Sequence, residues 1–181
     1  MSIVERVRID NPLPRHYLTD EPGLAGRIKM RPEDFIVEEL PLYEPGGEGE
    51  HLYLRVQKIS VSHGELLATL RKRFGVNERA IGYAGMKDKH AVTRQALSVH
   101  TKEDPSDLDV GHHRIQVLWS DRHRNKIKRG HLAGNRFVIK IRETDPIKTP
   151  LVAKTLRQLE THGVPAYFGS QRFGYRANNH L

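Results

Sequence analysis

The chain has 181 residues, which is enough for one domain and the beginning of a second. Its 30 lysine and arginine residues outnumber 22 aspartate and glutamate residues, and the net charge of +8 favours nucleic acid over an acidic membrane surface as a partner. Without cysteine, disulfides, a thiol nucleophile and cysteine-ligated metal sites are excluded. No apolar run is long enough to cross a membrane and the N-terminus lacks the apolar core of a signal peptide, so we expect a cytoplasmic protein.

Short strands dominate the first two thirds of the chain. Two-residue alternation and short apolar runs predict strands at residues 27–31, 35–40, 51–57, 81–85, 93–99, 114–119 and 137–141. Helical spacing of apolar residues predicts one helix between a capping box at Ser62 and a terminating Gly75, and a second at residues 146–161. Strands in hairpin-like succession predict an α+β fold, with a mixed, mainly antiparallel sheet and flanking helices.

Nucleotide and metal sites are not predicted. No G-x-G-x-x-G motif opens a helix, and the G-x-x-x-x-G-K-[ST] motif does not occur. The eleven histidines show no H-x-x-x-H or H-E-x-x-H spacing. His112 and His113 are adjacent, so on a strand they would point to opposite faces and make a poor ligand pair. We therefore expect no metal ion and no nucleotide cofactor.

The strongest candidate for chemistry is the segment of residues 82–90. Glycines bracket the end of its strand, and Asp88 then lies between Lys87 and Lys89. A neighbouring cation favours the anionic form of a carboxylate, and a carboxylate removed from water can act on a sugar as a nucleophile or a base. The alternative is a solvated turn, and the spacing alone favours this ordinary explanation.

Basic residues between positions 122 and 129 form a second candidate. Four of them recur every second residue, so an extended segment would line them on one side, where they could follow a phosphate backbone. The alternative is a solvated charged face. The basic run consists of Arg122, Arg124, Lys126, Lys128 and Arg129.

Two further segments carry residues suited to RNA recognition. Asn135 could hydrogen-bond a base edge and Phe137 could stack on a base, although core packing is the more common fate of a phenylalanine that opens a strand. Lys29 lies on the same face of the predicted strand as Arg31, where a charged edge that discourages strand pairing is the alternative.

Taken together, these motifs resemble the signature of the TruD family of RNA pseudouridine synthases. The resemblance extends from residue 29 to residue 174 and follows the order of the family's motifs. The matching motifs are Lys29 with residues 32–39, residues 47–52, Gly82-Tyr83-Ala84-Gly85-Met86-Lys87-Asp88-Lys89-His90-Ala91-Val92-Thr93-Arg94-Gln95, Gly134-Asn135-Arg136-Phe137, and residues 164–174.

The resemblance implies an enzyme that converts a uridine in RNA into its C-glycoside isomer without a metal, nucleotide or redox cofactor. In bacterial members the target is the uridine at position thirteen of transfer RNA, in the D-arm. Carried over by motif, Asp88 is the catalytic aspartate and Lys29 is its basic partner. Phe137 is the aromatic residue that stacks on the target base, and Asn135 and Phe35 belong to the pocket.

The resemblance also implies an incomplete catalytic domain. Members of the family are longer and carry an inserted domain after the motif at residues 164–174. We therefore expect residues 1–163 to be the N-terminal part of the catalytic domain and residues 164–181 to begin the insertion. The missing C-terminal part of the same protein is then a candidate partner, together with transfer RNA.

Two other functions remain open at this point. A non-catalytic RNA-binding module would use the same cations and aromatic residues without a need for Asp88. A glycoside hydrolase would need a second carboxylate beside the scissile bond, which Glu38 or Glu39 could supply.

Overall fold

The computed structural model describes residues 25–104 and 107–164, which fall into two compact units. The larger unit, Gly26–Thr144, contains a β-sheet and one α-helix. The described part of the other unit contains η3 (Pro146–Lys148) and α2 (Thr149–His162). The domain boundary predicted after residue 163 stays a prediction, since residues 165–181 and most of the last family motif lie outside the described residues.

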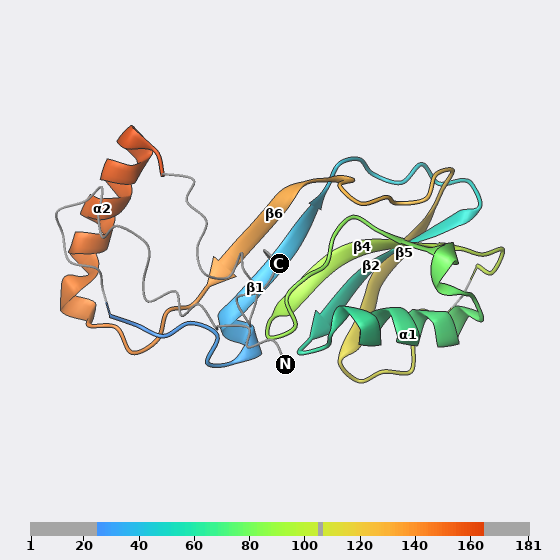
Figure 1. The fold of residues 1–181 in the computed structure, drawn as a ribbon, viewed down its shortest axis with the longest axis horizontal. Helices are drawn as coiled ribbons and strands as arrows, with labels where there is room; N and C mark the ends of the chain where they lie inside the picture. Colours follow the sequence, from blue (N-terminus) through green and yellow to red (C-terminus); the bar gives the residue numbers. More distant parts are fainter. Residues whose placement is uncertain (1–24, 105–106, 165–181) are drawn as a thin grey trace, which may run out of the picture. The chain divides into compact units, whose positions relative to one another are not determined.

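A mixed, six-stranded sheet forms the centre of the larger unit (Figure 1). The strand order is β5-β2-β4-β1-β6, with β3 also paired to β4. All pairs are antiparallel except β1 with β4, which confirms the predicted fold class. The strands are β1 (Phe35–Pro41), β2 (His51–Ile59), β3 (Ile81–Tyr83), β4 (Val92–His100), β5 (Ile115–His123) and β6 (Leu132–Ile139).

One edge of β4 changes partner along its length. Residues 92–94 of β4 pair with β1, whereas residues 97–99 pair with β3. The connection from β3 to β4, residues 84–91, therefore leaves the sheet where β1 and β3 separate. This connection carries Asp88, so the topology places the candidate carboxylate against β1 rather than at a remote corner.

The helix α1 (His63–Phe74) covers one face of the sheet beside β2 and β5, as Figure 1 shows. The predicted caps are confirmed: the Ser62 hydroxyl accepts a bond from the Glu65 amide, and Gly75 ends the helix at φ 60°. Its inward side packs into the main core, where each fully buried leucine contributes about 1.5–3 kcal/mol. The buried residues of α1 are Leu66, Leu67, Leu70 and Phe74.

The strand predicted at residues 27–31 is wrong. Only Arg27 forms an isolated bridge, with Arg142, and Lys29 has the left-handed φ of 58°. Pro32–Asp34 then forms a 3-10 turn, η1. The apolar residues responsible for the alternation, Ile28 and Met30, are 53% and 47% exposed, so their spacing does not reflect burial against a sheet.

The last strand also differs from the prediction. The last strand, β6, begins five residues before position 137, and it is the outermost strand beside β1, so Phe137, Val138 and Ile139 are all about half exposed. The helix predicted at residues 146–161 corresponds to η3 followed directly by α2. No helix of the described residues is both long and apolar enough to span a membrane.

Asp34 fixes the start of β1. Its carboxylate is 1% exposed and accepts two bonds of 2.7 Å from the Arg142 guanidinium and one of 3.1 Å from the Arg31 amide. The hydrogen bonds from Arg142 hold the pKa of Asp34 below its ordinary value. The start of β1, the segment after β6 and the turn next to Lys29 are thus held by one side chain.

The lowered pKa of Asp34 predicts an acid-sensitive fold. The stabilisation is present above the pKa of the unfolded chain, about 4, and is lost as pH falls through the lower pKa of the folded protein. Asp34→Asn should lower the melting temperature at pH 7 and flatten its dependence on pH below 4, as measured by circular dichroism. Glu33→Gln, at the exposed neighbouring position, is the control. An Asp34→Asn protein that melts like the wild type at pH 7 would contradict this role.

Candidate active site

Asp88 and Lys29 form an ion pair in the segments that lead into β4 and β1. The Lys29 ammonium nitrogen lies 3.0 Å from Oδ1 of Asp88, and the two side chains are 29% and 35% exposed. The positive φ of Lys29 is unfavourable by about 1 kcal/mol for a residue with a side chain, and the surrounding contacts maintain it. The structure thus brings together the two residues that the resemblance pairs, and both can be reached from solvent.

Two phenylalanines lie beside this ion pair. The Lys29 ammonium is 4.0 Å from the centre of the Phe35 ring, a cation–π contact. The Phe137 ring meets the Phe35 ring edge-on, with 5.9 Å between centroids. Phe35 is 8% exposed, whereas Phe137 is 52% exposed, so Phe137 retains a surface on which another ring can stack.

Asn135 lies on the same face of β6 as Phe137, two residues before it. In the β1–β6 register it stands opposite Glu39. The Asn135 side chain is exposed, and no hydrogen bond joins it to the described residues. Of the predicted site residues, Lys29, Phe35 and Phe137 therefore form a chain of contacts with Asp88. Asn135 lies two positions from Phe137 on β6 and makes no hydrogen bond to Asp88.

A buried ion pair lies next to Asp88 in the sequence. The Lys87 ammonium is 2.5 Å from Oε2 of Glu39, and the two side chains are 5% and 1% exposed. The other Glu39 oxygen accepts a bond from the Ala96 amide at 3.1 Å. Lys87 therefore does not flank Asp88 as a solvated cation. It anchors the loop to β1 and β4.

Glu39 is a residue whose importance the sequence analysis missed. Glu39 lies on the same face of the predicted strand as Phe35 and Val37. A carboxylate on this apolar face indicates a buried partner, and the sequence contained that signal. The structure also weakens the glycosidase alternative. Glu39 forms an ion pair with Lys87, and Glu38 lies 3.2 Å from Arg55. Neither carboxylate is therefore an unpaired second acid for a glycoside hydrolase.

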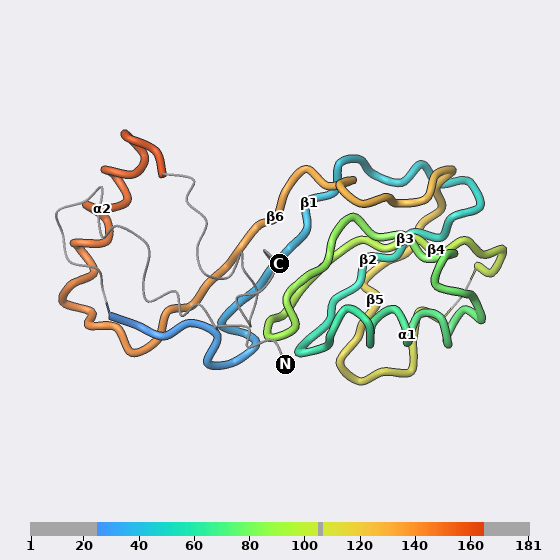
Figure 2. The backbone as a smooth tube through the Cα atoms, viewed as in Figure 1, coloured from blue at the N-terminus to red at the C-terminus, as the bar shows by residue number. Residues whose placement is uncertain are grey.

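The first two arginines of the basic run bind other loops of the protein. Arg122 donates to the carbonyl oxygens of Thr101 and Glu103, and Arg124 pairs with Glu48. Figure 2 shows the connection from β1 to β2, which carries Glu48, beside the chain that follows β5. These two arginines hold loops together, and the predicted contact of the basic run with an RNA backbone stays a prediction.

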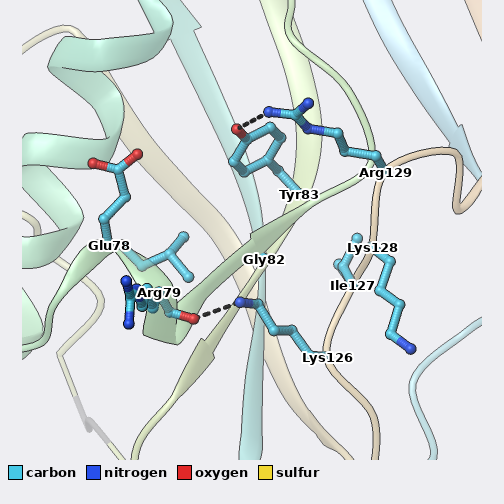
Figure 3. Close-up of a pocket in the computed structure, with 9 residues that line it drawn as sticks. Glu78, Arg79, Gly82, Tyr83, Lys126, Ile127, Lys128 and Arg129 are labelled. Carbon is cyan, nitrogen blue, oxygen red and sulfur yellow. Dashed lines mark hydrogen bonds between the residues drawn. The ribbon is translucent and has the colours of Figure 1, made fainter.

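The remaining members of the basic run surround an open pocket beside β3, drawn in Figure 3. Ile127 is 4% exposed and its amide donates to the Ser98 hydroxyl at 3.0 Å, so the chain turns its apolar residue inward between two lysines. Lys126, Lys128 and Arg129 line the pocket.

Among the described residues, no cluster of histidine, aspartate and glutamate could hold a metal ion. His112 and His113 lie before β5 rather than on a strand, and their rings are stacked with centroids 5.3 Å apart.

A family model described as tRNA pseudouridine synthase D (TruD) matches residues 14–181. The chain belongs to the TruD family. The tRNA pseudouridine synthase D of Syntrophotalea carbinolica is 49% identical over 167 residues, covering 92% of this chain and 42% of that protein. The tRNA pseudouridine synthase D of Sulfurimonas denitrificans is 42% identical over 167 residues, covering 92% of this chain and 47% of that protein.

A solved structure of the family has the same fold. The crystal structure of the putative TruD from Methanosarcina mazei superposes with a TM-score of 0.76 at 35% identity, covering 88% of this chain and 37% of that one. The chain spans less than half the length of these TruD relatives.

The Glu39–Lys87 pair gives a prediction for stability. Removing one partner of a buried ion pair leaves the other charge uncompensated and destabilises a protein by about 3–5 kcal/mol. Glu39→Gln should therefore lower the free energy of unfolding by this amount in urea titrations of the complete gene product. Glu38→Gln, on the more exposed neighbour, should cost about 1 kcal/mol or less. Equal effects of the two substitutions would contradict the assignment.

Proposed function

We propose that the complete gene product isomerises uridine to pseudouridine in transfer RNA, with Asp88 as the essential carboxylate. The observation that carries the proposal is the Lys29–Asp88 ion pair of 3.0 Å beside Phe35 and Phe137. The relatives named tRNA pseudouridine synthase D support transfer RNA as the substrate.

The reaction needs no redox partner. The bond between N1 of uracil and C1′ of ribose breaks, the uracil turns, and C5 joins C1′. C5 then loses a proton while N1 gains one, so the product is an isomer. Asp88 either attacks C1′ as a nucleophile or removes the C2′ proton to give a glycal, and both routes are compatible with the site. In each, the Lys29 ammonium provides a fixed positive charge for the carboxylate.

The target base must leave its stack before the sugar can reach Asp88, and this unstacking requires a few kcal/mol. Phe137 is half exposed beside the ion pair, and stacking of the base on its ring would offset about 1–3 kcal/mol. Asn135 presents an exposed amide from the same face of β6, where it can hydrogen-bond the edge of the base.

A non-catalytic RNA-binding module is the second candidate, favoured by the surplus of basic residues. The two functions differ in what Asp88 does for affinity. In a module without catalysis, a carboxylate in the binding site repels phosphate, so Asp88→Ala should bind RNA more tightly or equally well.

Asp88→Asn in the complete gene product should abolish pseudouridine formation, because the neutral amide neither attacks C1′ nor removes a proton. Affinity for transfer RNA should stay within a few fold of the wild type. The measurement maps the modified base in a transcribed transfer RNA, where we expect position thirteen. Asp104→Asn, at an 81% exposed position, is the control. Wild-type turnover by Asp88→Asn would remove Asp88 from the mechanism.

A further inference from the structure

A glycine allows the basic segment to lie directly on β3. A Cβ atom at Gly82 would lie 2.5 Å from the Ser98 hydroxyl and 2.8 Å from Cγ of Lys126, and it would also collide with the Ile127 carbonyl. The segment is fixed at its other end as well, because the Gly130 amide donates to the Ala84 carbonyl at 2.9 Å. The cations of this segment therefore project from a rigid backbone that is bonded to the start of the Asp88 loop.

The resulting pocket has a volume of about 680 Å³ and is open to solvent. Figure 3 shows Lys126 reaching the Arg79 carbonyl, at 2.5 Å, and Arg129 reaching the Tyr83 hydroxyl, at 3.4 Å. Each of these bonds uses only part of the donor capacity, since an ammonium has three N–H groups and a guanidinium has five. Lys126 and Arg129 are thus held in place by these bonds and keep further N–H groups that can donate to a ligand.

A second open pocket, of about 570 Å³, adjoins the first and shares Lys126 and Lys128 with it. Lys128 is exposed and points away from Tyr83 in Figure 3. The two pockets therefore share a wall that contains these two lysines. Each pocket is also lined by one acid: Glu78 in the first, which lies 3.9 Å from Arg71, and Glu44 in the second.

We propose that these two pockets bind consecutive phosphates of the RNA, with Lys126 and Lys128 between them and Arg129 in the first pocket. The inference rests on the proposed RNA substrate and narrows the RNA contact from the whole basic run to this surface. A phosphodiester chain suits the geometry because open, adjoining hollows with shared cations accept a continuous polyanion rather than an enclosed small molecule. Arg122 and Arg124, whose guanidinium groups hold loops, are outside this contact.

The test is the affinity of the complete gene product for a transcribed transfer RNA, measured by fluorescence anisotropy between 50 and 200 mM salt. Lys128→Glu with Arg129→Glu should weaken binding by about tenfold or more and reduce the slope of log affinity against log salt by roughly 0.7 for each phosphate that is no longer neutralised. Lys72→Glu with Lys102→Glu changes the charge equally at two exposed positions outside the pockets and should weaken binding by no more than about threefold.

The outcomes separate this proposal from the proposed activity. If the two double variants bind equally, the phosphate site is wrong, whatever the fate of Asp88→Asn. If the pocket variant alone loses affinity and salt dependence, the site is supported, even if the wild type formed no pseudouridine.

Lys58 is a fully buried lysine of β2. Its ammonium donates to the Asp88 carbonyl at 2.7 Å and to the Val61 carbonyl at 2.8 Å. It stands opposite Thr93 of β4 and Ile115 of β5 in the sheet. Burying an ammonium group costs free energy of desolvation unless hydrogen-bond partners compensate for the lost water. An apolar residue at this position would avoid that cost.

We infer that Lys58 is a positioning residue, which sets the place of the Asp88 carboxylate by holding the backbone of the same residue. Burial lowers the pKa of Lys58 to about 8, against the opposite pull of the carboxylates of Asp88 and Glu65. Lys87 also faces Lys58 and adds to the lowering, and the nearby His63 carries little charge because burial lowers its pKa. The ammonium is therefore held in place by the two carbonyls and the nearby carboxylates.

Lys58→Met in the complete gene product should lower kcat by about tenfold to a hundredfold with KM within a few fold, because the carboxylate is misplaced while RNA binding persists. Wild-type kcat should also decline above about pH 8 as Lys58 loses its proton, and this decline should be absent from the variant. Lys102→Met, at an exposed position, is the control.

A Lys58→Met protein with wild-type kcat and an unchanged pH profile would overturn the inference. If Lys58→Met does not fold, Lys58→Gln is read in the same way. If neither folds, the wild-type profile decides: a flat kcat between pH 7 and pH 9 overturns the role, and a decline supports it.

Discussion

Three ammonium groups hold the loop between β3 and β4 on the sheet. Lys58 of β2 donates to the Asp88 carbonyl, and Lys87 anchors the loop to Glu39. Lys29, in the segment before β1, forms an ion pair with the Asp88 carboxylate. Their environments differ, since Lys58 and Lys87 are buried and Lys29 is partly exposed. Lys58 and Lys87 fix the backbone of the loop. Lys29, which is partly exposed, binds the Asp88 carboxylate where substrate can enter. The proposed chemistry depends on this division of roles.

The elements that the sequence predicted well are those whose causes are local. The helix α1 follows from a capping box, apolar residues at helical spacing and a terminal glycine, all within fourteen positions of one another. The strands β1, β2 and β4 follow from alternation or from apolar runs, and their hairpin-like succession was enough for the α+β class. These signals are read directly from neighbouring residues.

The features that were missed depend on contacts between distant parts of the chain. Lys29 pairs with a residue 59 positions away, and its left-handed backbone contradicts the strand that Ile28 and Met30 suggested. Lys87 pairs with Glu39, 48 positions away, so its place beside Asp88 in the sequence was misleading. Arg122 and Arg124 likewise have partners far away in the sequence, Thr101 and Glu48, which the spacing of the basic run did not indicate. The family resemblance named Asp88, Lys29, Phe35 and Phe137, which alternation and spacing alone had not favoured.

The outermost strand of the described sheet, β6, carries both apolar and charged side chains. Among the described residues, β6 hydrogen-bonds to a neighbour on one side only, and apolar side chains project from both of its faces. Open backbone groups along an apolar strand are a template for pairing with another strand. Arg136 of β6 and Lys140, directly after the strand, are exposed, and charged side chains along such a strand discourage its pairing with a like-charged second copy.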